Sequence, residues 1–147
     1  MPAPSATAIS SATSADVDAI VRLWALVFPE YGDPRAPQRA PRASVERKLA
    51  FGDGLFWVAE RGGELVGTVM AGYDGHRGWI YSLGVHPSAR RLGLGRELAV
   101  TAERALAALG CPKVNLQVFA SNAAAQAFWR RAGWVEDAVL SFGKRVG

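Results

Sequence analysis

Glycine and arginine residues are closely spaced in one short segment of the chain. The segment 90–96 reads R-R-L-G-L-G-R, and it follows the mainly apolar run W-I-Y-S-L-G-V at residues 79–85. Gly93 and Gly95 lack the Cβ atoms that would keep a ligand off the main chain, so successive N–H groups at a helix start can point at one anion. The arginines add charge-assisted hydrogen bonds, worth about 1.5–3 kcal/mol against about 1 kcal/mol for neutral ones. The segment therefore predicts a phosphate-binding loop.

Two common phosphate-binding motifs do not account for this segment. The P-loop of nucleoside triphosphate-binding proteins needs G-x-x-x-x-G-K-[ST], and neither that spacing nor the lysine is present. A dinucleotide fingerprint needs a third glycine where Leu98 stands, and it belongs to a parallel βαβ unit. The strands expected before residue 86 form antiparallel hairpins. The P-loop is excluded, and the dinucleotide fingerprint is disfavoured.

The elements that must position the loop follow from hydrophobic periodicity and from turn residues. Phe28 to Ala43 holds four prolines and is expected to be a long loop, and R-G-G at residues 61–63 is expected to be a three-residue hairpin turn. We expect helices at 14–27, 44–49, 94–109 and 122–132, strands at 9–12, 55–60, 64–73, 79–85 and 113–118, and one or two terminal strands over 134–144. This order predicts an α/β fold in which a mixed sheet of six to seven strands is flanked by four helices.

The composition fits one globular domain over residues 1–147, with residues 1–8 flexible. No apolar run approaches the ~18 residues that cross a membrane, and residues 1–15 lack a secretory signal pattern. The single cysteine, Cys111, excludes an internal disulfide and is interpreted as structural. We therefore expect a cytoplasmic protein without a membrane partner. The formal charge of +4 is mild and the arginines are dispersed, so no nucleic-acid partner is expected.

A second motif lies at residues 120–134, which read A-S-N-A-A-A-Q-A-F-W-R-R-A-G-W. Together the two motifs resemble the GNAT superfamily of N-acetyltransferases. Arg90, Gly93 and Gly95 match its signature [RQ]-x-x-G-x-[GA], and its motif N-x-x-A-x-x-F-Y-x-x-x-G-F is matched by Asn122, Ala125, Phe128, Gly133 and Trp134. The segments from Gly67, Gly110 and Leu140 look like a small bacterial YpeA-like branch of the family. The resemblance covers residues 9–146.

The resemblance implies that acetyl-CoA lies between two splayed parallel strands, residues 79–85 and 113–118. The pantetheine arm would bond to the main chain of the first strand, and the pyrophosphate would bind at the start of the following helix. The cofactor-binding residues would be Leu83, Gly84, Val85, Arg90, Arg91, Leu92, Gly93, Leu94, Gly95, Arg96, Asn122 and Trp129. For Asn122, a helix N-cap and a contact with the pantetheine arm are equally open.

The positions at which relatives carry proton-transferring groups are occupied differently in this chain. Relatives often have a tyrosine acid where Trp129 stands, and a glutamate base where Gln117 or Trp79 stands. An indole or amide cannot take either role. A thiol with a pKa near 8.5 leaves as a thiolate without much help, so losing the base matters more than losing the acid. We therefore expect an acceptor amine of low pKa, or a water relay to another group.

Candidate substitute catalytic groups lie on the strand at residues 79–85 and in the turn before it. Asp74 and His76 lie in that turn, and His76 has a suitable ordinary pKa near 6.5. Tyr81 is expected to share a strand face with Leu83 and Val85 and to line the acetyl pocket, or to pack across the strands. The acceptor pocket would also involve the 28–43 loop, where Glu30 and Tyr31 contact the acceptor or form loop surface. His86 is interpreted as a loop residue.

The resemblance favours an acetyl-CoA-dependent N-acetyltransferase that acts directly on a primary amine, in a small molecule or at a protein or peptide α-amine. The alternative is a non-catalytic acyl-CoA-binding module that has lost the chemistry. With two histidines and one cysteine, no metal site is expected. The sequence leaves open the identity of the acceptor, the length of the acyl chain and a homodimer.

Overall fold

The computed structural model describes residues 6–32 and 40–147, which form two compact units. The larger unit ends at Leu116 and the smaller one runs from Gln117 to Gly147. The larger unit holds a sheet in the order β1-β2-β3-β4-β5, with strands β1 (Thr7–Ser11), β2 (Phe56–Arg61), β3 (Glu64–Tyr73), β4 (Gly78–Val85) and β5 (Val114–Asn115). The mixed α/β class is confirmed, with five strands across the described ranges instead of six to seven.

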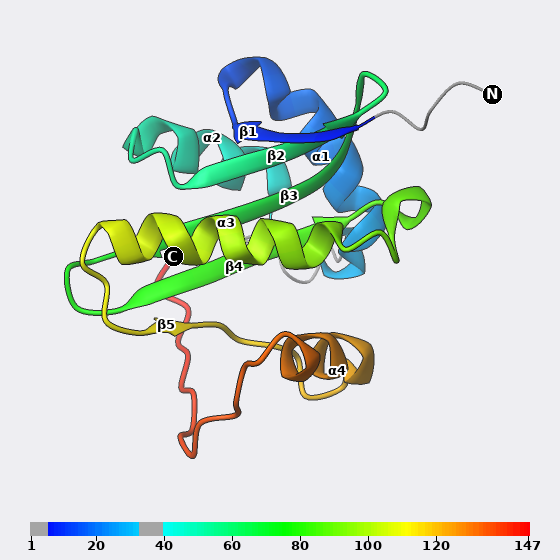
Figure 1. Cartoon of the computed structure of the whole chain (residues 1–147). Coiled ribbons are helices and arrows are strands. Elements are labelled where there is room, and N and C mark those ends of the chain that lie inside the picture. Colours follow the sequence, from blue (N-terminus) through cyan, green and yellow to red (C-terminus); the bar gives the residue numbers. More distant parts are fainter. Residues whose placement is uncertain (1–5, 33–39) are drawn as a thin grey trace. The chain divides into compact units, whose positions relative to one another are not determined.

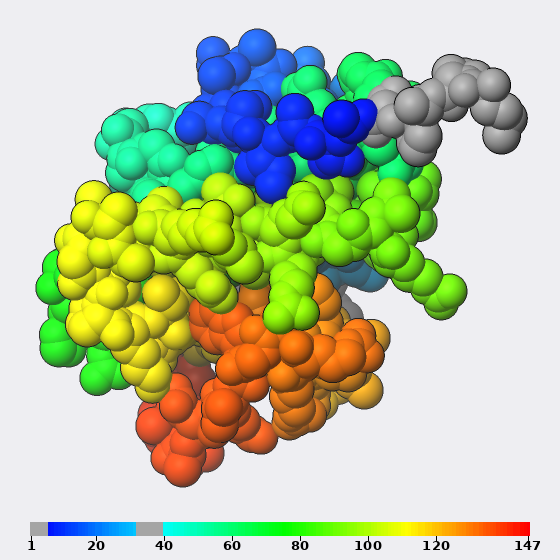
Figure 2. Space-filling model, in the orientation of Figure 1, coloured from blue at the N-terminus to red at the C-terminus, as the bar shows by residue number. Residues whose placement is uncertain are grey.

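Helices cover both faces of this sheet (Figure 1). Helices α1 (Val17–Val27) and α2 (Pro41–Phe51) lie on one face, and α3 (Leu94–Ala108) lies on the other. The helices approach the sheet closely at two glycines of the strands. A Cβ atom at Gly84 would lie 2.9 Å from the Val27 side chain, and one at Gly67 would lie 2.9 Å from the Leu98 side chain. In the space-filling view α3 covers this face, and the loop before it protrudes at one end (Figure 2). No helix of the described ranges is long and apolar enough to span a membrane.

The N-terminal part of the chain contains a strand and a well-capped helix. Thr13 and Asp16 form a capping box around the short 3-10 helix η1 (Ser14–Asp16), which leads into α1. The apolar face of α1 buries Ile20, Leu23 and Trp24. Of the residues 1–8 that were expected to be flexible, 1–5 lie outside the described part of the chain. Thr7 and Ala8 belong to β1 and pair with β2.

The segment expected to be one long loop between Phe28 and Ala43 contains helical structure. A 3-10 helix, η2 (Pro29–Gly32), follows α1, and α2 begins at Pro41 instead of Ser44. Proline fits the first turn of a helix because its missing N–H would have had no partner there. Residues 33–39 lie outside the described ranges.

The β2–β3 connection is a two-residue turn instead of the expected three-residue turn. Arg61 pairs directly with Glu64, and only Gly62 and Gly63 lie between the strands. Both glycines have positive φ, +61° and +79°. This combination is typical of a type I′ turn, whose twist matches that of a hairpin.

The smaller unit contains α4 (Ala123–Arg131) and no strand in the described chain. The expected strand at residues 134–144 is therefore wrong, and the strand expected at 113–118 is reduced to β5. The alternation that suggested the C-terminal strand has no buried face to support it. Val139, Leu140 and Phe142 are all more than 75% exposed.

Candidate active site

Strand β4 contains one extra residue opposite β3. The register is Met70↔Tyr81 and then Thr68↔Gly84. Val69 alone therefore stands opposite both Ser82 and Leu83, which makes this a β-bulge. Ser82 has a φ of +52°, in the left-handed region that side chains other than glycine rarely adopt. The bulge lies within the strand that the sequence assigns to cofactor binding.

The bulge changes which side chains of β4 share a face. The Tyr81 ring lies 4.0 Å from the Cβ position of Gly72, and Gly84 faces helix α1. Gly72 is on the α1 face of β3, so Tyr81 and Gly84 point to the same side although they are three positions apart. The expectation that Tyr81 shares a face with Leu83 and Val85 is wrong. One inserted residue shifts the two-residue alternation of a strand.

The parallel pairing between β4 and β5 is short. It consists of Gly78 with Val114 and Trp79 with Asn115, and no ladder partner follows on this edge of β4 within the described residues. The main-chain groups of residues 80–85 therefore form no ladder on this edge with a described strand, and we call this stretch the open edge of β4. Asn115 Oδ1, at the end of the pairing, is a buried acceptor without a hydrogen-bond partner in the described structure.

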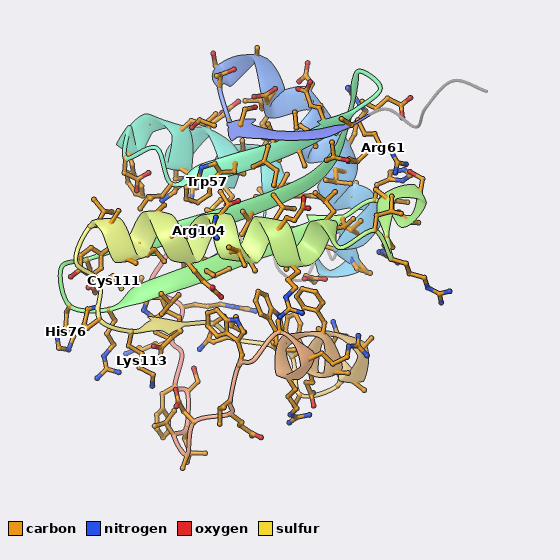
Figure 3. All side chains as sticks on the ribbon, viewed as in Figure 1. Trp57, Arg61, His76, Arg104, Cys111 and Lys113 are labelled. Carbon is orange, nitrogen blue, oxygen red and sulfur yellow. The ribbon has the colours of Figure 1, made fainter. Side chains whose placement is uncertain are left out.

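The loop between β4 and α3 is fastened to the sheet by arginine side chains. Arg90 Nε donates to the Val85 carbonyl oxygen over 3.1 Å, and Arg61 Nη2 donates to the Ser88 carbonyl oxygen over 2.9 Å. Ser88 belongs to the 3-10 helix η4 (Pro87–Ala89), whose N-cap is the His86 imidazole. His86 Nδ1 accepts from the Ser88 N–H over 3.0 Å, so this histidine has the loop role expected of it. Figure 3 shows Arg61 at this end of the sheet.

The end of this loop has the geometry of an anion-binding helix start. Arg91 and Gly93 have positive φ values of +65° and +77°, and α3 begins directly afterwards at Leu94. A Cβ atom at Gly93 would meet no atom within 4 Å, so the main chain faces open space there. The first N–H groups of a helix have no partner within the helix and carry partial positive charge. Leu94 is buried and anchors the turn, whereas Arg96 is exposed.

The two acid–base candidates in the β3–β4 turn lie at the other end of β4. Asp74 Oδ1 accepts the N–H groups of His76 and Arg77, each over 2.7 Å. Hydrogen bonds from the main-chain N–H groups of Arg77, the larger effect, and of His76 hold the pKa of Asp74 below its usual range. This carboxylate therefore stabilises the turn and is a weak base. His76 is exposed at the tip of the turn (Figure 3). From Gly78 to Leu83 an extended strand spans about 16 Å, which is too far for direct proton transfer.

Tyr81 lies next to the bulge and is about half exposed. Its ring stacks with Trp79 at a centroid distance of 6.4 Å. Burial raises the pKa of Tyr81, and the negative charge of Asp74 adds to this effect. The phenol therefore stays protonated at neutral pH and can donate a hydrogen bond.

The candidate residues of the smaller unit have local structural roles. Asn122 Oδ1 accepts from the Ala125 N–H over 3.0 Å and caps α4. Trp129 is buried and makes an edge contact with Trp134 at 5.2 Å. Gln117 Nε2 donates to the Ser141 hydroxyl group. The cofactor contacts of Asn122 and Trp129 stay predictions.

The site also has polar contacts that the sequence did not reveal. Trp24 Nε1 donates to Thr68 Oγ1, and Thr68 Oγ1 donates to the Ser82 carbonyl oxygen, each over 3.0 Å. The Tyr31 hydroxyl lies 3.4 Å from Ser82 Oγ. These residues come from distant parts of the chain, and no short motif links them. Within residues 6–32 and 40–147, no group of three His, Cys, Asp or Glu side chains is placed to bind a metal ion.

An open strand edge that leads through a glycine turn into a helix start is an arrangement suited to a phosphate-containing ligand in an α/β protein. The acetyltransferase (GNAT) family model matches residues 18–134, which include parts of both units. A curated relative, acetyltransferase SG1711 of Sodalis glossinidius, is 42% identical over 132 residues, or 89% of each chain. The chain therefore belongs to the GNAT family of N-acetyltransferases.

Solved structures agree with this fold. An aminoglycoside N-acetyltransferase, AAC(6')-Iy in complex with CoA, matches with a TM-score of 0.79 and 21% identity, covering 99% of each chain. A GCN5-related N-acetyltransferase from Ralstonia eutropha matches with a TM-score of 0.71 and 26% identity, covering 95% of this chain and 99% of the other. Ard1 from Thermoplasma volcanium matches with a TM-score of 0.75 and 22% identity, covering 90% and 85%.

Proposed function

We propose that this acetyltransferase transfers an acetyl group from acetyl-CoA directly to a primary amine within a ternary complex. The observation that carries the proposal is the continuous main-chain path from the open edge of β4, residues 80–85, to the start of α3 at Leu94. The edge offers hydrogen bonds to the pantetheine amides, and the helix start offers N–H groups to the pyrophosphate. Arg90, Arg91 and Arg96 add positive charge around the phosphates.

The reaction proposed here needs no covalent enzyme intermediate. The neutral amine nitrogen attacks the thioester carbonyl carbon, the C–S bond breaks, and CoA leaves as a thiolate while the amine loses a proton. A main-chain N–H of residues 83–85 would stabilise the oxyanion, a contribution worth about 3–4 kcal/mol of barrier where it has been measured. Tyr81, protonated beside the bulge, would donate a hydrogen bond to the developing thiolate. Asn115 Oδ1 would accept an N–H of a bound substrate.

The acceptor favoured by this arrangement has an amine of low pKa. The Asp74 carboxylate is held by its turn, and Gln117 and Trp129 cannot act as bases. At pH 7.5 an α-amine of pKa about 7.8 is roughly one third neutral, whereas a lysine of pKa about 10.4 is only about 0.1% neutral. We therefore propose a small-molecule amine of low pKa or a peptide α-amine as the acceptor class. A proton would then leave through water instead of a dedicated base.

A screen of amines tests the acceptor class. CoA release from acetyl-CoA would be measured at pH 7.5 with α-amine peptides, small amines of graded pKa, and peptides blocked at the N-terminus that contain lysine. We expect turnover to rise as the amine pKa falls toward 8. Faster acetylation of lysine side chains would contradict the acceptor class. CoA binding without turnover on any amine would contradict catalysis and indicate the non-catalytic acyl-CoA-binding module.

A pair of arginine variants on one helix tests the phosphate site. Arg96 lies in the first turn of α3, whereas Arg104 is exposed about 12 Å further along the same helix (Figure 3). Arg96→Ala is expected to weaken CoA binding about tenfold and to reduce its salt dependence. Arg104→Ala removes the same charge and is expected to leave the affinity unchanged. Equal effects of both variants would indicate only a long-range charge effect.

Tyr81→Phe tests the proposed role of the phenol. The variant keeps the ring and its stacking on Trp79 but removes the hydroxyl group. We expect kcat to fall about tenfold, since one hydrogen bond to the developing thiolate is lost, while the KM for acetyl-CoA stays within twofold. An unchanged kcat would assign Tyr81 to packing alone.

A further inference from the structure

The hydroxyl group of Thr68 connects helix α1 to the bulge in β4. Thr68 and Trp24 are both fully buried, and Trp24 Nε1 donates to Thr68 Oγ1 over 3.0 Å. The hydroxyl in turn donates a hydrogen bond to the Ser82 carbonyl oxygen, also over 3.0 Å. An indole can only donate a hydrogen bond, so it occupies a lone pair of the hydroxyl and leaves the proton for the carbonyl. The direction of the whole chain of hydrogen bonds is therefore fixed.

The backbone conformation of Ser82 needs such a stabilising contact. Its φ of +52° is unfavourable for a side chain other than glycine, and such conformations persist only where surrounding contacts impose them. The Thr68 bond fixes its carbonyl group, and the Tyr31 hydroxyl lies 3.4 Å from its side chain. Without the bond to Thr68, Ser82 would be free to return to an extended conformation. The register of Leu83 and the residues after it would then change.

The indole that orients Thr68 is itself held firmly. Its ring stacks with Tyr31 at a centroid distance of 5.3 Å and with Phe56 at 6.0 Å. The Thr68 hydroxyl therefore has a fixed donor on one side and a single acceptor on the other. Thr68 also pairs across the sheet with Gly84, inside the proposed pantetheine stretch.

We propose that Thr68 is a positioning residue for acetyl-CoA, which acts by holding Ser82 in the bulge so that the main chain of residues 83–85 is aimed at the cofactor. The proposal rests on the assignment of this edge to acetyl-CoA in the proposed function. Thr68 is not expected to touch the substrate. Its effect passes through the Ser82 carbonyl group alone.

Three variants separate the hydroxyl group from the shape of the side chain. Thr68→Val keeps the branched shape and removes the hydroxyl, and it is expected to raise the Kd for CoA about tenfold in calorimetric titration. Thr68→Ser keeps the hydroxyl, and its Kd is expected to stay within about threefold of the wild type. Thr68→Val with Ser82→Gly is expected to recover most of the lost affinity, because glycine adopts positive φ without steric cost. This double variant also relieves the strain if the single variant folds poorly.

Asp53→Ala is the control for loss of stability. Asp53 pairs with Lys48 over 2.8 Å at the end of α2, away from the bulge, so the variant loses stability while its Kd for CoA is expected to match the wild type. Amide chemical shifts of residues 83–85 would report the bulge directly and should move in Thr68→Val but not in Asp53→Ala. A Thr68→Val protein that binds CoA as tightly as the wild type would overturn the proposal and leave the acetyltransferase assignment intact. A wild-type protein that binds no CoA would overturn the proposed function and this inference together.

Discussion

Lys48 and Thr68 are the two buried polar side chains of the described core, and each binds a main-chain carbonyl group of the sheet. Lys48 Nζ donates to the Ala71 carbonyl oxygen of β3 and to Asp53 Oδ2. Thr68 donates to the Ser82 carbonyl oxygen of β4. Lys48 does this with a charge that needs a counter-ion, whereas Thr68 uses a neutral hydroxyl group. Ala71 and Thr68 lie about 10 Å apart along β3.

We call these two hydrogen-bonded contacts the Lys48 anchor and the Thr68 anchor. The first is expected to matter for stability and the second for cofactor binding. The Lys48 anchor joins the end of α2 to a regular part of β3, where no ligand is proposed. The Thr68 anchor holds a strained residue beside the open edge of β4. A charged anchor is costly to disrupt because an ammonium group without a partner cannot stay buried. The neutral anchor costs less stability, and its loss is expected to be seen chiefly in cofactor affinity.

Asp53→Ala gives the largest expected loss of stability. It leaves Lys48, which is only 8% exposed, with the Ala71 carbonyl oxygen as its remaining hydrogen-bond acceptor among the described contacts. Removing the counter-ion of this buried ammonium group should lower the free energy of unfolding by about 3 kcal/mol, measured by urea denaturation at pH 7. CoA affinity should be unchanged in the same protein. A parallel loss of affinity would remove the distinction between the two anchors.

Lys48→Met should have a smaller effect than Asp53→Ala. Methionine fills the space of the lysine stem, and the remaining Asp53 side chain is 35% exposed and accepts the Leu55 N–H. We expect a loss of about 1–2 kcal/mol, chiefly from the unpaired Ala71 carbonyl. Comparing the loss of unfolding free energy in the two variants under identical conditions shows which partner is more unfavourable to leave unpaired. A reversed order would show that Lys48 reaches water once Asp53 is gone.

The pH dependence of stability should depend on the Lys48 anchor and not on the Thr68 anchor. Burial tends to raise the pKa of Asp53, but hydrogen bonds from Lys48 and the Leu55 N–H outweigh it and hold the pKa below its usual range. A lowered folded-state pKa stabilises the protein above the unfolded value of about 4, and this contribution is lost as the pH falls through the folded value. Urea denaturation between pH 7 and 3 should give a flatter profile for Asp53→Ala than for the wild type. Thr68→Val should keep the wild-type slope.

The smallest expected effect is the coupling between the two anchors. They share no hydrogen-bond partner and are about 10 Å apart, so the losses of stability in Asp53→Ala and Thr68→Val should add within about 0.5 kcal/mol in the double variant. A double-mutant cycle measures this directly. A larger coupling would mean that β3 transmits strain between the two positions.

The sequence predicts those features that local patterns encode. The turn into α3 could be located because Gly93 and the neighbouring arginines form a compact motif, and the Asn122 cap follows from residue type and position. The order of the strands before α3 follows from alternation and turn residues. In each case the signal lies within about fifteen residues of the chain.

The anchors and the bulge could not be read from the sequence. Trp24 and Thr68 are 44 residues apart, and threonine in a strand is ordinarily a β-branched surface or packing residue. Ser82 gives no sign of a positive φ, because that conformation is imposed by contacts and is not a preference of serine. The same shortage of local signal explains the misplaced C-terminal strand, where alternation alone did not ensure a partner strand.

The register of β1 has a consequence for the order of folding. The β2–β3 hairpin closes over Gly62 and Gly63 alone, whereas pairing Ser11 with Trp57 encloses both α1 and α2. Loop-closure entropy makes the longer connection costlier by roughly 2–3 kcal/mol at the moment of contact. The β2–β3–β4 meander should therefore form first in the folding reaction, with β1 added as a late edge strand. Substitutions in β1 should then accelerate unfolding more than they slow folding.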